Sequence, residues 1–165
     1  MANRCDDCGF DWDTPLLEKI QVIGRFPDRA AELLQGAGDA AYRRPEPEIW
    51  SPNEYLWHLV DVFRVFPEWL HMTRTLDHPT HNPLEGDQAA QARGYGERPV
   101  ETALWALRHA IELFVQEAAI ADPERQVTYK DWRDDVTAGE VIGFAAHEVV
   151  HHTMDVQRGL QVATV

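Results

Sequence analysis

Four long stretches of this 165-residue chain repeat apolar side chains at helical spacing, and this pattern constrains the fold more than any other feature. Each stretch opens on a helix-start signal, and the four signals are Thr14-Pro15, Ser51-Pro52-Asn53-Glu54, Pro99 and Thr137-Ala138-Gly139-Glu140. The second and fourth are capping boxes, and proline is favoured in a first helical turn. Four amphipathic helices in one domain predict an all-α four-helix bundle.

The helix ends and the connections divide the chain further. Gly36-Ala37-Gly38 ends the first helical stretch, and the second runs to about Leu76. Pro27 and Pro67 are expected to kink or divide the helices that contain them. Two longer connections, 77–98 and 122–136, lack the hairpin signals of a substantial sheet. We therefore expect an N-terminal tail over residues 1–13 and a single bundle over 14–161.

Charge and hydropathy narrow the classes of function. The net charge is −13, from 28 acidic against 15 Lys and Arg residues. Such a balance argues against nucleic-acid binding and against docking on anionic membranes. No apolar run approaches the ~20 residues of a membrane span, and no signal peptide is evident. The expectation is a cytoplasmic protein that acts on a small molecule.

His147 and His151 are the strongest chemical signal in the sequence. Residues four apart lie on one face of a helix, so both imidazoles can reach one metal ion. His58 in the second helix borders the apolar stripe and is the predicted third ligand. Three imidazoles with an open fourth position suit Zn²⁺, Ni²⁺ or Fe²⁺, and Asp61 and Asp155 are candidates to orient the rings. The alternative for each histidine is a hydrogen-bonded core residue.

Read literally, His147-Glu148-Val149-Val150-His151 is also the H-E-x-x-H motif of zinc peptidases, with Glu148 as catalytic base. Met154 and Gln157 stand where a metzincin has glycine and its third histidine. No acidic residue follows Asp155 to complete a gluzincin site. Glu148 is more simply a solvated side chain, and a peptidase or other hydrolase ranks below the main hypothesis.

Cys5-Asp6-Asp7-Cys8-Gly9 is the second chemical signal, since C-x-x-C supplies half of a tetrahedral zinc site. His78 and His81 have the same two-residue gap and could complete a Cys₂His₂ site. The first interpretation is a pair of free thiols on a frayed tail, the second is this structural zinc site, and the third is an oxidation-sensitive dithiol.

Two segments resemble the DinB-like superfamily. Residues 50–61 (WSPNEYLWHLVD) resemble its second-helix pattern W-S-x-x-E-x-x-x-H-l-x-D, and residues 147–155 (HEVVHHTMD) resemble its terminal pattern H-x-x-x-H-x-x-D/Q. The resemblance implies a four-helix bundle that holds a divalent metal on three histidines, mapped onto His58, His147 and His151. Homodimers are common in this family.

The resemblance also suggests an activity. Characterised members include thiol S-transferases and the mycothiol-dependent maleylpyruvate isomerase, which implies a low-molecular-weight thiol cosubstrate. A metal-dependent hydrolase and a non-catalytic, stress-associated metal binder are the alternatives. The sequence does not choose the electrophile or the thiol.

Overall fold

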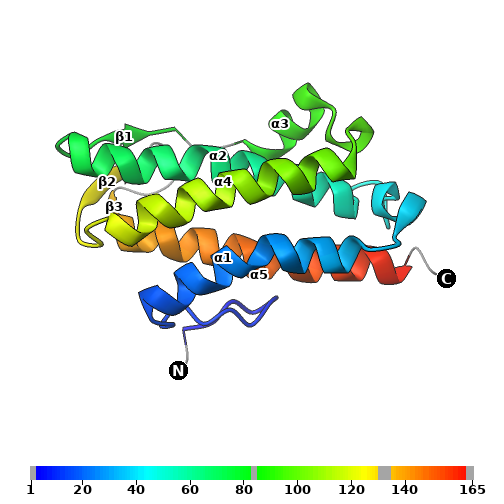
Figure 1. The fold of residues 1–165 in the computed structure, drawn as a ribbon, viewed down its shortest axis with the longest axis horizontal. Coiled ribbons are helices and arrows are strands. Elements are labelled where there is room, and N and C mark those ends of the chain that lie inside the picture. The colour runs from blue at the N-terminus through cyan, green and yellow to red at the C-terminus, as the bar shows by residue number, and fades with distance from the viewer. Residues whose placement is uncertain (1–2, 83–84, 130–134, 163–165) are drawn as a thin grey trace.

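The computed structural model describes residues 3–82, 85–129 and 135–162. Its four long helices are α1 (Leu16–Leu34), α2 (Pro52–Thr75), α4 (Val100–Ile120) and α5 (Ala138–Val162). They lie roughly alongside one another and form the bundle in Figure 1. The predicted all-α four-helix bundle is confirmed.

Local capping explains where two of these helices start. The Ser51 hydroxyl accepts from the Glu54 backbone N–H at 3.3 Å, and the Glu54 carboxylate accepts from the Ser51 N–H at 2.8 Å. Thr137 and Glu140 repeat the arrangement before α5, at 3.1 and 2.8 Å. Both predicted capping boxes are present, and each satisfies amide groups that a helix start leaves unpaired.

Both interior prolines lie within continuous helices. Pro27 and Pro67 lie inside α1 and α2, and neither divides its helix. Both prolines are buried, so packing of the surrounding apolar face compensates for the lost backbone hydrogen bond. The start of α1 also differs, because Pro15 is the N-cap residue and no side chain caps this helix.

The two long connections carry short elements. A helix α3 (Gly86–Arg93) and 3-10 turns at Gly38–Tyr42 and Tyr95–Glu97 lie near one end of the bundle. At the other end, β1 (Thr80–His81) pairs in parallel with β2 (Gln126–Tyr129), which pairs antiparallel with β3 (Asp135–Thr137). Figure 1 shows this small sheet and α3 at opposite ends.

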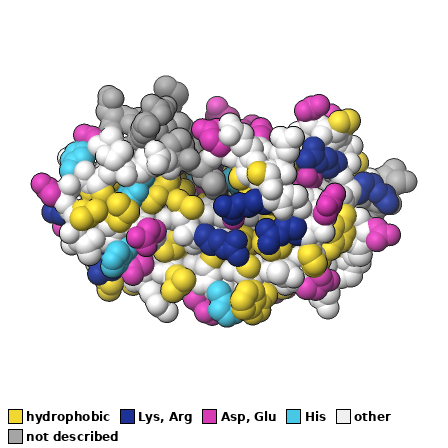
Figure 2. All heavy atoms as spheres, turned by 90° about the horizontal axis from the view of Figure 1, so that it is seen from above, with side chains coloured by type: hydrophobic (Ala, Val, Ile, Leu, Met, Phe, Trp, Pro, Cys, Tyr) yellow, Lys and Arg dark blue, Asp and Glu magenta, His cyan; other side chains and the backbone are white. Residues whose placement is uncertain are grey.

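The core lies where α2 packs against α4 and α5, and α1 closes the other side against the same two helices. Its largest fully buried side chains include Trp57, Phe63, Leu107, Phe114 and Ile142. The face seen in Figure 2 carries Lys and Arg side chains near its middle and acidic side chains mostly toward the margins. In the described part of the chain, no helix has a stretch long and apolar enough to cross a membrane.

The N-terminal segment is packed against the bundle, contrary to the expected frayed tail. Arg4 and Asp11 form an antiparallel bridge, and the Cys5 N–H donates to the Phe10 carbonyl at 2.9 Å. Phe10 is only 8% exposed, and its ring lies against His147 of α5. Residues 3–12 are therefore a small hairpin on the α5 side of the molecule, because burial of Phe10 ties them to the core.

Candidate metal centre

Glu148 of α5 meets His58 of α2 in the interior of the bundle. The His58 Nε2 atom lies 3.1 Å from Glu148 Oε2, and their side chains are 13% and 28% exposed. His58 is near the second turn of α2, so the capping box at Ser51 fixes its position along the helix. A carboxylate from one helix and an imidazole from another are thereby brought into direct contact.

His152 completes this group from the next turn of α5. Its Nε2 atom lies 3.3 Å from Glu148 Oε2, and its Nδ1 atom lies 2.9 Å from Asp155 Oδ2. One potential ligand atom from each of His58, Glu148 and His152 falls within 4.8 Å of the others. We call these three residues the open group.

In the open group, the carboxylate of Glu148 and the imidazole of His152 each stabilise the charged form of the other. Burial by itself would raise the pKa of Glu148, but hydrogen bonds from His152 and His58 hold that pKa well below its ordinary value. Burial would lower the pKa of His152, and hydrogen bonds to Asp155 and Glu148 outweigh this and raise it to about 9. Glu148 is thus an anion at neutral pH, which is the form that binds a cation.

Aromatic residues form the walls of the open group. Trp50 packs on His58 with ring centroids 5.3 Å apart, and Tyr55 packs on His152 at 5.0 Å. Gly86 at the start of α3 comes so close that an added Cβ would lie 3.3 Å from Trp50 and 3.5 Å from His58 Nδ1. A larger residue at position 86 would push into these walls, so glycine permits α3 to cover the site.

His147 and His151 lie on a neighbouring face of α5, where they meet the N-terminal hairpin. Potential ligand atoms of Cys5, Cys8, His147 and His151 all fall within 4.8 Å of one another. Cys5 Sγ lies 3.9 Å from His151 Nδ1, and the Trp12 ring stacks on His147 at 4.8 Å. We call these four residues the closed group.

The structure therefore divides the three histidines of the sequence-predicted site between the two groups. His58 falls in the open group, whereas His147 and His151 fall in the closed group. Successive helical residues are rotated by about 100°, so the face of residues 147 and 151 and the face of residues 148 and 152 point in different directions. In the tertiary structure, the second face is turned toward α2.

The histidines predicted to complete the cysteine site lie elsewhere. The exposed His78 pairs with Asp135 of β3 at 2.9 Å. His81 is 4% exposed and stacks on Trp69 at 4.9 Å. His81 belongs to β1 and His78 lies just before this strand, and neither is among the ligand atoms grouped with Cys5 and Cys8. The pairing of β1 with β2 holds His81 in the small sheet, and the His78–Asp135 contact holds His78 beside it.

The two aspartates predicted to orient the ligands have different roles. Asp155 contacts His152 as described. Asp61 is 2% exposed and accepts hydrogen bonds from Arg93 and the Tyr95 hydroxyl, so it anchors the α3 connection to α2. Burial, followed by the hydrogen bond to Asp61, raises the pKa of Tyr95. Asp61 therefore supports the fold near the open group. Among the described residues, it forms no hydrogen bond with His58 or His152.

The donor chemistry of the open group suits a divalent metal. Two imidazoles and one carboxylate are the protein ligands of one common catalytic zinc site, in which the fourth position stays open. Asp155 behind His152 is the carboxylate that typically fixes the orientation of a ligating imidazole. The residues present therefore fit a bound divalent ion.

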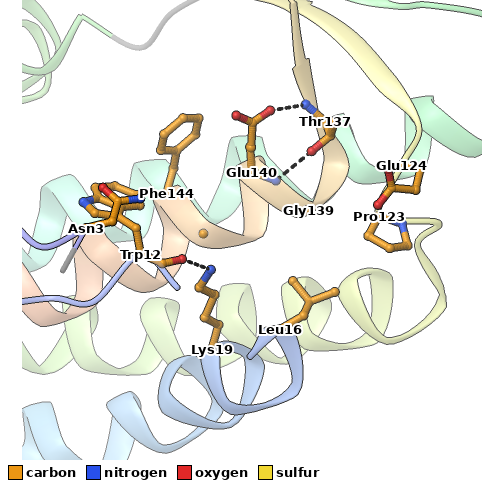
Figure 3. Close-up of a pocket in the computed structure, with 11 residues that line it drawn as sticks. Asn3, Trp12, Leu16, Lys19, Pro123, Glu124, Thr137, Gly139, Glu140 and Phe144 are labelled. Carbon is orange, nitrogen blue, oxygen red and sulfur yellow. Dashed lines mark hydrogen bonds between the residues drawn. The ribbon is translucent and has the colours of Figure 1, made fainter. Parts of the chain in front are cut away.

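A hollow of about 680 Å³ adjoins the closed group on the outside. Figure 3 shows Trp12 and Phe144 on one side of it, and Thr137 and Glu140 at the start of α5. Lys19 donates to the Trp12 carbonyl at 2.8 Å and links α1 to the hairpin. Trp12, whose ring stacks on His147, lines this hollow, whereas the four residues of the closed group are not among its lining residues.

These features define a four-helix bundle with a candidate divalent-metal centre between α2 and α5. The family model of the DinB superfamily matches residues 23–155. The chain belongs to this superfamily, and the family resemblance noted in the sequence is confirmed. No curated protein matches the chain.

A solved structure has the same fold. It is that of YfiT from Bacillus subtilis, which is described as a probable metal-dependent hydrolase with an unusual four-helix bundle topology. The match has a TM-score of 0.77 at 14% sequence identity and covers 88% of this chain and 87% of that one. At this identity the similarity supports the fold.

His152 and Glu148 are not among the metal ligands that the sequence analysis predicts. The signal was present in the family pattern H-x-x-x-H-x-x-D/Q. Counted back from Asp155, the pattern places its second histidine at His152 and its first at position 148, where this chain has glutamate. Counting from His147 instead puts Met154 at the acidic position. The register anchored on Asp155 is the one whose residues meet His58.

Proposed function

We propose that this protein is a metal-dependent enzyme whose divalent ion is held by His58, Glu148 and His152. The observation that carries the proposal is the convergence of these three ligand atoms within 4.8 Å, with Asp155 hydrogen-bonded behind His152. A bound divalent ion lowers the pKa of a water or thiol at its open position and so supplies a nucleophile at neutral pH.

The residues of this chain would do the remaining work. Glu148 contributes negative charge between the two imidazoles, and Asp155 holds His152 with its Nε2 atom toward Glu148. Trp50 and Tyr55 cover the two histidines and reduce contact with bulk water. Such half-buried walls strengthen charge interactions inside the site.

For the reaction, we propose transfer or isomerisation with a low-molecular-weight thiol, as the family resemblance implies. In the transfer, the thiol sulfur forms a bond to an electrophilic carbon, the leaving group departs with its electron pair, and the thiol proton passes to solvent. In the isomerisation, the thiol adds to a carbon–carbon double bond together with its proton, and both are eliminated again after rotation about that bond. Hydrolysis is the second candidate, because the His₂Glu donor set is typical of hydrolytic zinc sites. The description of YfiT as a probable metal-dependent hydrolase favours the same candidate.

The peptidase hypothesis has little support. His147 and His151 face two cysteines, and Glu148 lies in hydrogen-bond contact with His58 on the other face of α5. The glutamate of a zinc peptidase must lie beside the water on the metal that the two motif histidines bind. The described strands form a small sheet at the bundle's end, away from α3, rather than a peptide-binding edge beside the histidines.

Activity assays on metal-loaded protein separate these candidates. Thiol transfer is measured with 1-chloro-2,4-dinitrobenzene plus cysteine, glutathione or mycothiol, and hydrolysis with p-nitrophenyl acetate in the absence of thiol. Turnover that requires both metal and thiol supports the transferase. Ester cleavage without thiol supports the hydrolase, and cleavage of casein would revive the peptidase.

Three variants test the site itself. His58→Ala and Glu148→Ala should lower turnover by more than about 100-fold, since loss of a ligand exceeds the 10- to 100-fold cost of losing a supporting residue. His78→Ala is the matched control, because this exposed histidine lies outside both groups. Glu148→His, which restores the family residue, should retain bound metal. Metal binding without turnover of any probe would leave a non-catalytic metal binder and contradict the proposal.

A further inference from the structure

The closed group contains the donors of a complete zinc site. Its ligand atoms come from two thiols and two imidazoles within 4.8 Å of one another, and all four residues are partly buried. A tetrahedral zinc ion keeps its ligand atoms roughly 3.3–3.8 Å apart, so the 3.9 Å separation of Cys5 Sγ and His151 Nδ1 needs little adjustment. The side chains are nearly in place for four-coordinate binding.

The backbone around Cys5 favours the thiolate form of this residue. The Gly9 N–H donates to the Cys5 carbonyl at 2.9 Å, and Gly9 has a φ of 73°, which glycine adopts without strain. Hydrogen bonds from the backbone N–H groups of Cys8 and Asp7 lower the pKa of Cys5 to about 7. Burial raises the pKa of Cys8, against a hydrogen bond from the Phe10 backbone. The thiolate, which these backbone groups favour at Cys5, is the form of cysteine that binds a metal.

Aromatic side chains fix the orientation of His147 in the closed group. Trp12 stacks on His147 at 4.8 Å and Phe10 meets the same ring edge-on at 5.6 Å, so the imidazole has a fixed orientation. Its Nε2 atom is buried and has no hydrogen-bond partner among the described residues. A buried polar atom without a partner is costly, and a ligand bound there would remove that cost.

We propose that Cys5, Cys8, His147 and His151 bind a structural zinc ion that fastens the N-terminal hairpin to α5. The site is separate from the proposed catalytic centre, and neither proposal depends on the other. Four protein ligands leave no open position, which distinguishes a structural zinc site from a catalytic one. Zinc binding releases the thiol protons to solvent and involves no oxidation.

Part of the proposed zinc site lies outside the region that this chain shares with the family model. The family model begins at residue 23, so Cys5 and Cys8 lie outside the matched region. Two of the four ligands come from the hairpin and two from α5, more than 130 residues later in the chain. One ion would therefore close a loop that spans most of the sequence and would hold Trp12 against the hollow in Figure 3.

Metal content measured by mass spectrometry on protein purified from zinc-supplemented cells tests the proposal. The full-length wild type should carry about one zinc equivalent more than Cys5→Ser/Cys8→Ser. His58→Ala should keep that equivalent, because it alters only the open group. The exposed His78→Ala control should also keep it, and its loss there would favour the pairing of the cysteines with the sheet histidines. Circular dichroism checks that each variant is folded.

Cobalt substitution supplies an independent readout. Wild-type protein loaded with Co²⁺ should show a thiolate-to-cobalt charge-transfer band and the intense visible bands of tetrahedral cobalt. The charge-transfer band should be absent from Cys5→Ser/Cys8→Ser and weakened in His151→Ala, whereas visible bands from cobalt at the open group have no thiolate contribution and do not depend on the cysteines. Equal zinc content in wild type and the cysteine variant, or a wild type with a Cys5–Cys8 disulfide and no zinc, would overturn the proposal.

Discussion

Helix α5 has two faces that carry histidines, and the two faces are offset by one residue along the helix. The elements that pack against these faces supply different numbers of potential metal ligands. The face of His147 and His151 meets two thiols, which completes a set of four ligands. The face of Glu148 and His152 meets one imidazole from α2, which leaves a set of three. The same i, i+4 spacing can therefore serve a structural site or a catalytic one, and the neighbouring element decides which.

The two groups also differ in charge. Glu148 and Asp155 place two carboxylates at the open group, whereas thiols provide the anionic donors of the closed group. His151 and His152 are adjacent, with ring centroids 5.5 Å apart. Metal binding at two groups this close would be separable by experiment because their donor atoms belong to different chemical classes.

The largest effect that separates the groups is expected from Asp155→Asn. Asp155 Oδ2 lies 2.9 Å from His152 Nδ1 but 3.7 Å from His151 Nε2. The change should weaken metal binding at the open group by roughly 10- to 100-fold and affect the closed group less. Metal titrations of the variant monitor each group, with thiolate-to-cobalt absorption reporting the closed one.

Asp135→Asn is a matched control for that experiment, since Asp135 pairs with a histidine outside both groups. It should leave both affinities unchanged. Equal weakening of the two sites by Asp155→Asn would show that the groups act as one unit and would remove the distinction drawn between them.

A smaller effect is expected at His81, a buried histidine with no described thiol or carboxylate partner. Burial lowers the pKa of His81 from 6.5 to about 4, and its Nε2 atom has no hydrogen-bond partner among the described residues. At a pH between these two pKa values, His81 is protonated in the unfolded chain and neutral in the folded protein. Stability is therefore full above about pH 6.5 and is lost as the pH falls toward 4.

The comparison of wild type with His81→Phe isolates this contribution. Between about pH 7 and pH 5 the wild type should lose roughly 2 kcal/mol more of its unfolding free energy than the variant. Phenylalanine can keep the stacking on Trp69 without a titrating group. Urea unfolding at several pH values measures the difference, and parallel curves for the two proteins would contradict the assignment.

The smallest predicted effect concerns the turn that holds the cysteines. Gly9 has a φ of 73° and no described atom within 4 Å of an added Cβ, so Gly9→Ala strains the backbone without a clash. We expect a cost of about 1 kcal/mol, which weakens zinc binding at the closed group roughly 5-fold. Competition with a chromogenic zinc chelator measures the change.

Gly36→Ala is the matched control, because Gly36 has a φ of 76° and equally open surroundings at the end of α1. It should lower the unfolding free energy by a similar amount and leave the zinc affinity unchanged. If Gly9→Ala binds zinc as tightly as the wild type, the turn does not contribute to the closed group.

The elements that the sequence predicted well are those controlled by neighbouring residues. The capping boxes at Ser51 and Thr137 set helix starts through contacts three residues apart, and both form as expected. Helix α3 and the small sheet were missed because short elements inside a connection leave little periodic signal. The hairpin at residues 3–12 was missed because its stability comes from Phe10 packing on α5, a contact between distant parts of the chain.

The sequence by itself determined the bundle, the family and the pairing of residues along α5: position 147 with 151, and position 148 with 152. These follow from helical periodicity, which is a local property of the backbone. Only the tertiary structure decided that His58 faces Glu148 and that the cysteines face His147. The rotation of α5 about its axis is set by the packing of its whole apolar face, and about 100° separates the two faces.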